Sequence, residues 1–133
     1  MRYPHSESLK NSRDFRKVYE TGKSSANRLL VMYVRENGTK RNRVGISVSK
    51  KIGNSVVRHR ITRLIRESYR LNEDMFSNGL DIVVVARKGS KDGSLNEITD
   101  ALLHLGKLRG IIKKNEISDD QDDPALSKIP VTP

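Results

Sequence analysis

Residues Lys50–Arg70 read K-K-I-G-N-S-V-V-R-H-R-I-T-R-L-I-R-E-S-Y-R and contain seven basic residues but only one acid, Glu67. A helical period places a mostly apolar set of side chains on one face: Val57, Ile61, Leu64, Ile65, Ser68 and Leu71. The opposite face and its shoulders carry the arginine stripe: Arg58, Arg60, Arg63, Arg66 and Arg70. Asn54 or Ser55 can cap the start, and Asn72 can end the helix. The stretch predicts an amphipathic helix that follows a lysine pair in a loop.

The arginine stripe has two interpretations, a solvated surface or a contact for a polyanion. Solvated helix surfaces usually mix charges of both signs, because oppositely charged residues four apart attract each other. Here five arginines share the helix with one glutamate, and like charges at this spacing repel. The imbalance favours a surface that a polyanion neutralises.

The whole chain narrows the choice of partner. Its 133 residues carry a net charge of +10, and residues 116–133 alone contribute −4, so residues 1–115 carry +14. Such a basic body favours nucleic acid over a membrane surface, because the apolar side of the helix is needed for the core. The chain has no cysteine and no apolar run of 18 residues, and its start lacks a signal-peptide pattern. We expect a cytoplasmic protein with no membrane contact.

The order of elements predicts one α+β domain with a single sheet. Residues 1–8 are expected to be a mobile arm, and 113–133 an acidic, disordered tail. A short helix capped by Asn11 or Ser12 is expected to end at Gly22. A strand at 28–35, a turn at Asn37-Gly38 and a strand at 43–49 predict a hairpin. After the basic helix follow a buried strand at 81–86 and a helix opened by the Ser94–Glu97 capping box.

The residues do not predict a catalytic centre in the protein. The three histidines, His5, His59 and His104, have no metal-ligand spacing, and no glycine-rich phosphate loop is present. Phe15, Val18 and Tyr19 share one side of the first helix beside several basic residues. This arrangement fits core packing and base stacking equally well. Because the basic helix lies between two strands, RNA is favoured over DNA, although a DNA-binding regulator stays open.

Several motifs in register resemble the protein subunit of bacterial ribonuclease P. The sequence K-K-I-G-N-S-V-V-R-H-R-I-T-R-L-I-R from Lys50 is similar to the family signature of lysine, glycine, asparagine and an Arg-Asn-Arg run. The flanking motifs occur in the family's order: D-F-R-K-V-Y-x-x-G at 14–22, R-V-G-I-S-V-S-K at 43–50 and D-I-V-V-V-A-R at 81–87. The resemblance covers the predicted domain, residues 9–112.

The resemblance implies a fold like the second domain of ribosomal protein S5. In that fold a four-stranded sheet carries packed helices, in the order α-β-β-(β)-α-β-α. It also implies a left-handed βαβ crossover around the basic helix, an exception to the usual handedness. The periodicity of this sequence shows only three strands, so a fourth is expected between Gly22 and Val44.

The resemblance further implies a function in tRNA maturation. In ribonuclease P the RNA subunit is the catalyst and uses bound Mg²⁺, while the protein binds that RNA and the 5′ leader of precursor tRNA. By this resemblance no catalytic group and no metal site belong to the protein itself. The residues that would face the catalytic RNA are Lys50, Lys51, Asn54, Arg58, Arg60, Arg63 and Arg66. Phe15, Tyr19 and Tyr33 would line the cleft that holds the single-stranded leader.

One position departs from the family pattern. His59 replaces the middle asparagine of the Arg-Asn-Arg run, and an imidazole offers its donor and acceptor in a different geometry from an amide. The contact made by that asparagine therefore does not carry over to this chain. A different structural RNA-binding protein, for example one associated with the ribosome, is the alternative function.

Overall fold

The computed structural model of the protein describes residues 3–113, so the predicted acidic tail lies outside it except for Lys113. The strands are β1 (Ser6–Ser8), β2 (Lys23–Ala26), β3 (Leu30–Glu36), β4 (Asn42–Ser47) and β5 (Leu80–Ala86). The helices are α1 (Ser12–Thr21), α2 (Ser55–Leu71) and α3 (Leu95–Leu108). Two short 3₁₀ turns, η1 (Glu73–Met75) and η2 (Lys88–Ser90), flank β5. None of these helices is long and apolar enough to cross a membrane.

The five strands form one mixed sheet in the order β1-β4-β5-β3-β2. Strand β5, the continuous apolar run predicted at 81–86, lies in the centre, parallel to β4 and antiparallel to β3. The α+β class with one sheet is therefore confirmed. Helix α2 connects the parallel neighbours β4 and β5, and the left-handed sense of that crossover stays a prediction.

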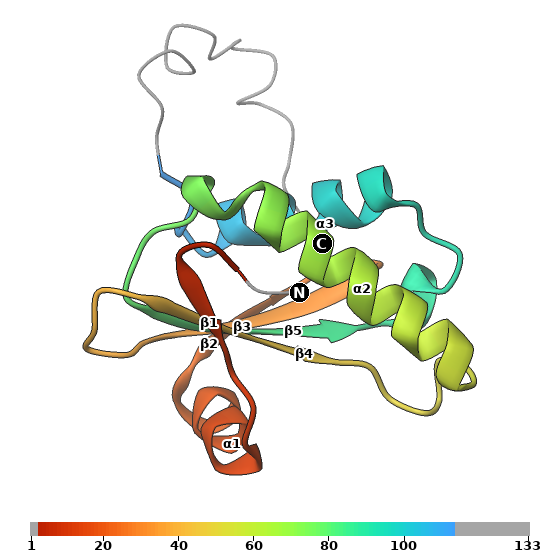
Figure 1. Ribbon diagram of the computed structural model, residues 1–133, viewed down its shortest axis with the longest axis horizontal. Helices are drawn as coiled ribbons and strands as arrows, with labels where there is room; N and C mark the ends of the chain where they lie inside the picture. The colour runs from red at the N-terminus through yellow and green to blue at the C-terminus, as the bar shows by residue number, and fades with distance from the viewer. Residues whose placement is uncertain (1–2, 114–133) are drawn as a thin grey trace, which may run out of the picture.

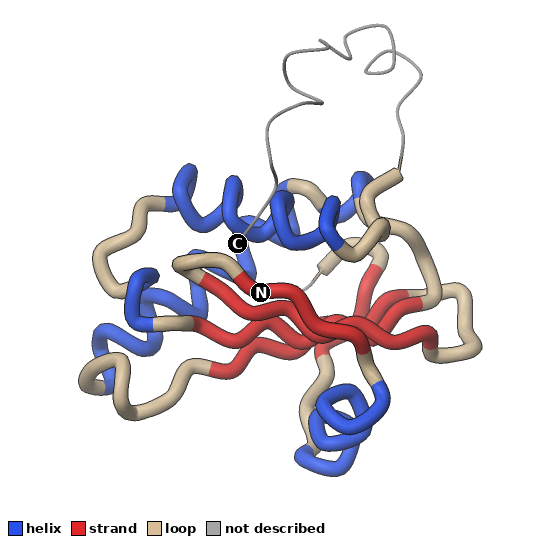
Figure 2. Tube along the Cα trace, turned by 180° about the vertical axis from the view of Figure 1, so that it is seen from behind, coloured by secondary structure: helices blue, strands red, loops and turns tan. Residues whose placement is uncertain are grey.

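Helices cover the two sides of the sheet unequally. Figures 1 and 2 show α2 and α3 on one side and α1 alone on the other. The main core lies between the sheet and the helix pair, where Met32, Ile61, Ile65, Ile82 and Leu102 are fully buried. The α1 side holds a small cluster around Leu9, Val18 and Val83. Much of the α1 side of the sheet is therefore free of helix cover.

The predicted hairpin between residues 28–35 and 43–49 is wrong. Strands β3 and β4 are not neighbours, because β5 lies between them and bonds to both. The chain does change direction at Asn37-Gly38, although Asn37 lacks the positive φ of a two-residue hairpin turn. Gly38 has a positive φ of 74°, and the Asn37 side chain accepts a hydrogen bond from the Thr39 amide at 2.8 Å. The true hairpin is β2–β3, and β2 is the strand expected between Gly22 and Val44.

The N-terminal residues differ from the expected mobile arm. Ser6–Ser8 form β1, which pairs in parallel with β4, and the Tyr3 ring is buried against Tyr69. Buried Glu73 holds the strand in place. Its carboxylate accepts hydrogen bonds from the Ser6 hydroxyl at 2.5 Å and from the His5 amide at 3.0 Å. A strand of only three residues, all of them polar, carries no apolar alternation by which it could be recognised from sequence.

Helix α2 has the caps and most of the core stripe that its sequence predicts. Asn54 caps the start by accepting a hydrogen bond from the Val57 amide at 3.0 Å, and Asn72 lies at the end. Ile61, Ile65 and Ser68 are buried as expected. The last turn differs, because Tyr69 is buried while Leu71 is exposed. Tyr69 packs between the rings of Tyr3 and Phe76, with centroid distances of 5.1 and 5.0 Å.

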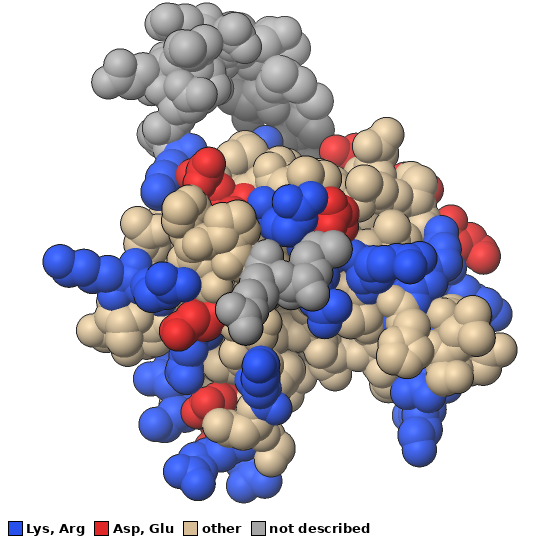
Figure 3. All heavy atoms as spheres, in the orientation of Figure 1, with Lys and Arg blue, Asp and Glu red and all other residues tan. Residues whose placement is uncertain are grey.

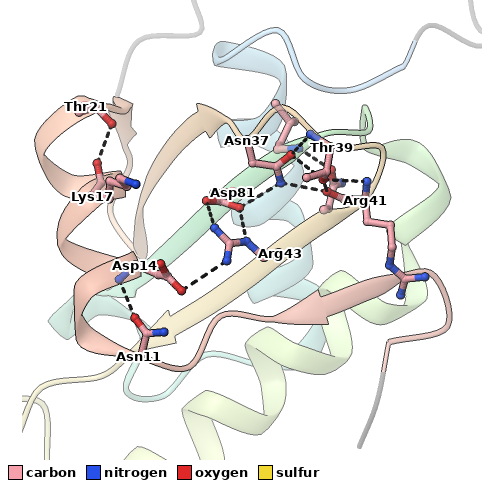
Figure 4. Close-up of polar contacts among 11 residues, drawn as sticks. Asn11, Asp14, Lys17, Thr21, Asn37, Thr39, Arg41, Arg43 and Asp81 are labelled. Carbon is pink, nitrogen blue, oxygen red and sulfur yellow. Dashed lines mark hydrogen bonds and ion pairs between the residues drawn. The ribbon is translucent and has the colours of Figure 1, made fainter.

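A buried acid, Asp81, and its partner Arg43 join β5, β4, the β3–β4 loop and α1 on the α1 side of the sheet (Figure 4). Asp81 of β5 receives two hydrogen bonds from the Arg43 guanidinium at 2.6 and 2.8 Å and one from the Asn37 amide at 3.0 Å. Arg43 also reaches Asp14 of α1 at 3.3 Å. Burial alone would raise the pKa of Asp81. The hydrogen bonds from Arg43 and Asn37 outweigh it and hold this pKa below its ordinary value of 3.8.

We predict that Asp81→Asn lowers the free energy of unfolding by about 2 kcal/mol at pH 7, because it leaves Arg43 without its buried partner. A carboxylate with a lowered folded-state pKa stabilises the fold above the unfolded-state pKa, and this stability is lost as the pH falls through the folded-state pKa. The free energy of unfolding, measured with urea, should therefore fall more steeply below about pH 4 for the wild type than for the variant. Exposed Asp74→Asn is the control. If the free energy of unfolding fell equally steeply with decreasing pH in Asp81→Asn and in the wild type, the prediction would be contradicted.

Candidate nucleic-acid interface

The loop before α2 presents the predicted lysine pair to solvent. Lys50 and Lys51 are exposed, and buried Ile52 anchors the loop between them and the helix. The Lys51 amide donates to the Ser49 hydroxyl at 3.1 Å, which fixes the direction of the turn. Since the Asn54 oxygen caps the helix, only its amide nitrogen is available to an outside acceptor. The loop thus offers two ammonium groups and one amide donor close to the helix start.

The structure divides the arginine stripe into different environments. Arg63 is exposed, while Arg58 and Arg66 are half-buried. None of these three makes a salt bridge with an acid in residues 3–113. The Nε of Arg58 is buried and has no hydrogen-bond partner within the same range. Arg70 instead pairs with Glu67 in its own helix. Three guanidinium groups therefore carry charge that no described acid neutralises.

Arg60 has a structural contact that its place in the motif did not predict. Its guanidinium donates to the backbone carbonyls of Lys91 at 3.1 Å and Gly93 at 2.8 Å. Both carbonyls belong to the connection between η2 and α3. Arg60 therefore links α2 to this connection, and part of its hydrogen-bonding capacity is already used.

His59, the departure from the family motif, is exposed near the start of α2. It lines a hollow of about 230 Å³ together with Ile46, Val48, Arg58 and Thr62. This hollow lies between the end of β4 and the first turns of α2. The imidazole therefore stands beside Arg58, where a neighbouring nucleotide could meet both side chains.

The three predicted aromatic residues form one cluster on the α1 side of the sheet. The rings of Phe15 and Tyr19 lie 6.3 Å apart, and Tyr19 meets Tyr33 edge-on at 4.9 Å. Tyr19 is 39% exposed, and the other two are half-buried. Phe15 rests on Gly45, because a Cβ atom there would lie 2.5 Å from its ring. The approachable backbone of β4 is therefore covered by an aromatic ring.

A second group of basic residues surrounds a cavity of about 350 Å³ at the carboxyl ends of β4 and β5. We call it the basic cavity, and its lining residues are Arg28, Ser49, Lys51, Ile52, Ala86, Arg87, Lys88 and Gly89. Only Lys51 was a predicted site residue. The sequence does contain a signal for this cavity, because a basic pair follows each of the two strands. It was not recognised, because the wrongly predicted hairpin did not make β4 and β5 neighbours. Figure 3 shows the large excess of Lys and Arg over acids on one face of the molecule.

One set of potential metal ligands occurs among the described residues. Donor atoms of His5, Glu73 and Asp74 lie within 4.8 Å of one another. The Glu73 carboxylate already accepts hydrogen bonds that hold β1, as described above. Burial raises the pKa of nearby Tyr3 to about 12, although the adjacent Arg66 partly opposes this. These contacts explain the buried carboxylate as part of the fold.

The contrast between Arg60 and Arg63 gives a stability prediction. Arg60→Ala should lower the free energy of unfolding by about 1 kcal/mol, because two carbonyl contacts between α2 and the η2–α3 connection are lost. Arg63→Ala should change it by less than about 0.5 kcal/mol, because its exposed side chain makes no such contact. Urea unfolding of the two variants measures the difference. Equal losses would show that the carbonyl contacts do not stabilise the fold.

Comparison with known proteins places these features in a family. The family model described as Ribonuclease P matches residues 3–108. The ribonuclease P protein component of Lachnoclostridium phytofermentans is 64% identical over 111 residues, which span 84% of this chain and 96% of that protein. The component from Alkaliphilus oremlandii is 52% identical over 104 residues, 78% of this chain and 91% of that protein.

Solved structures agree with the sequence relatives. The Staphylococcus aureus RNase P protein has a TM-score of 0.74 and 37% identity, and the match covers 81% of this chain and 99% of that one. The Thermotoga maritima RNase P protein has a TM-score of 0.71 and 32% identity, with coverage of 80% and 99%. The chain therefore belongs to the ribonuclease P protein family, the protein component of the endoribonuclease that processes the 5′ end of tRNA.

Proposed function

We propose that this chain docks on the catalytic RNA of ribonuclease P through α2 and the loop before it. The observation that carries the proposal is the set of guanidinium groups at Arg58, Arg63 and Arg66 that no acid in residues 3–113 neutralises. RNA phosphates would supply the missing negative charge, and the buried Nε of Arg58 would gain an acceptor. Lys50, Lys51 and Asn54 extend the same contact at the helix start. Arg60 contributes mainly by fixing α2 against the η2–α3 connection.

The aromatic cluster is proposed to hold the single-stranded 5′ leader of precursor tRNA. Phe15 lies over Gly45 of β4. Gly45 and Tyr33 of β3 are both paired with Val83 of the central strand β5. Arg87 of the basic cavity lies four positions after Val83, a distance of about 13 Å along a strand. Bases could stack on the cluster while the following phosphates meet Arg28, Arg87 and Lys88.

The chemical step is assigned to the RNA subunit, with Mg²⁺ bound by that RNA and the substrate. The distribution of potential acid–base groups in the chain supports this division. His5, His59 and His104 lie on separate elements, and His104 hydrogen-bonds with Asn27 at 3.1 Å. The proposed place of action is the cytoplasm, where precursor tRNA is processed in bacteria.

Reconstitution tests the docking proposal. Adding the chain to bacterial ribonuclease P RNA should restore cleavage of the 5′ leader at an Mg²⁺ concentration at which the RNA alone is inactive. Arg63→Ala should weaken RNA binding and lower the salt slope by about 0.7–0.9, because one phosphate contact is lost. Exposed Lys40→Ala, on the β3–β4 loop, is the matched control. Binding to the catalytic RNA without any rescue of cleavage would favour another structural RNA-binding role.

The leader contact gives a separate prediction. Phe15→Leu keeps an apolar side chain over Gly45 but removes the ring, so affinity for precursor tRNA should fall about tenfold. Affinity for mature tRNA, which lacks the leader, should change little. Phe15→Tyr keeps the ring and should retain the preference for precursor. Equal losses for both tRNAs with Phe15→Leu would mean that Phe15 serves only in packing.

A further inference from the structure

The acids near the C-terminus lie beyond the domain that this chain shares with its relatives. The family match ends at Leu108, whereas the acids are Glu116, Asp119, Asp120, Asp122 and Asp123. The match to the Lachnoclostridium phytofermentans protein covers 96% of that protein but only 84% of this chain. Residues 116–133 carry a charge of −4 against +14 for the preceding residues. The chain therefore carries a polyanionic segment beyond the polycationic domain that the family model matches.

The last described residues lead the chain toward α2. Ile112 pairs with Phe76, and the Lys113 amide donates to the Met75 carbonyl at 2.7 Å. The Phe76 ring in turn packs on Tyr69 in the last turns of α2. Figure 1 shows the blue end of the described chain beside the C-terminal end of α2. The described chain thus ends close to the last turns of α2, which carry Arg66 and Arg70.

The segment is long enough to follow the arginine stripe. Residues 119–123 are six to ten positions beyond Lys113 and can reach about 20–35 Å from it. The distance from Arg70 back to Arg58 along the helix axis is about 18 Å. The chain between Lys113 and the four aspartates is therefore at least as long as the stretch of α2 from Arg70 to Arg58.

A second basic surface near the exit is less suitable. Lys23, Arg35 and Arg109 line a hollow of about 490 Å³, but Glu36 lines it too. Ile111 also lines this hollow, but two residues later the Lys113 amide is hydrogen-bonded to the Met75 carbonyl, outside the hollow. On α2, by contrast, the single acid Glu67 is paired with Arg70. The guanidinium groups of Arg58, Arg63 and Arg66 form no salt bridge with any acid in residues 3–113.

We propose that residues 116–123 bind the arginine stripe of α2 as an internal polyanion that RNA must displace. An attached segment acts at an effective concentration on the order of 1 mM, so even a weak contact competes. Competition lowers the affinity of the stripe for every RNA by the same factor. An RNA that binds weakly is then no longer bound, whereas an RNA that binds tightly still is. The identity of the competing RNA rests on the proposed function, whereas the internal contact does not.

The internal contact can be measured without RNA. Because the chain has no cysteine, Ser118→Cys accepts a single spin label beside the aspartates. We expect paramagnetic broadening of the backbone amides of Arg63 and Arg66, and none of those in α1. The broadening should vanish at about 1 M salt, where charges are screened beyond about 3 Å, and when the four aspartates are changed to asparagine. Broadening that survives these changes, or that centres on Lys23 and Arg109, would overturn the proposal.

The effect on binding is measured with the unlabelled full chain. Changing Asp119, Asp120, Asp122 and Asp123 to asparagine should tighten binding to the catalytic RNA and to an unrelated single-stranded RNA alike. We expect the affinity for both RNAs to rise about two- to tenfold at low salt and to be unchanged at about 1 M salt. Gln121→Ala is the control that keeps the charge. Unchanged affinities at low salt would overturn the competition. If neither chain binds the catalytic RNA, the proposed function fails, while the spin label still decides the internal contact.

Discussion

The rest of the structure depends on strand β5, which is hydrogen-bonded on both edges and covered on both faces. Its even-numbered residues Ile82 and Val84 belong to the main core under α2 and α3, and its odd-numbered residues Asp81 and Val83 face α1. A strand buried this way has to be nearly all apolar, and Asp81 is the exception. Its charge is tolerated because Arg43 and Asn37 saturate the carboxylate. The same strand therefore fixes both layers of the molecule relative to each other.

This arrangement separates the two candidate contacts for RNA. The apolar stripe of α2 must face the core through Ile61 and Ile65, so its arginines have to face outward on that side of the sheet. The aromatic cluster lies on the opposite side, where α1 leaves part of the sheet uncovered. The two surfaces meet at the carboxyl ends of β4 and β5, where Lys51 and Arg87 line the basic cavity. One domain can thus offer a docking helix on one side of the sheet and a single-strand surface on the other, with Lys51 where they meet.

Periodicity predicted the elements from this sequence better than their pairing. The caps of α1 and α2, the central strand and the separation of apolar from arginine side chains on α2 all depend on local patterns, and the structure contains them. The β3–β4 hairpin failed because strand pairing depends on which strand can be covered on both faces, and the Asn37-Gly38 turn carries no information on that. Strand β1 was missed because Glu73, which anchors it, is distant in sequence. The Arg60 contact was missed for the same reason, since its acceptors are Lys91 and Gly93.

A helix with an unbalanced arginine stripe is stable here because other contacts offset the repulsion. Side-chain capping by Asn54, burial of Ile61 and Ile65, and the packing of Tyr69 between two rings do not depend on charge. An anion that binds the stripe relieves the repulsion among the arginines, and this relief contributes to the binding free energy. The contribution becomes smaller as the salt concentration rises. Any anion that reaches the stripe draws on the same free energy. On the proposal above, an acidic segment that reaches about 20–35 Å from Lys113 and an RNA backbone compete for the same stripe, and the number of phosphates that the RNA places within reach sets the outcome.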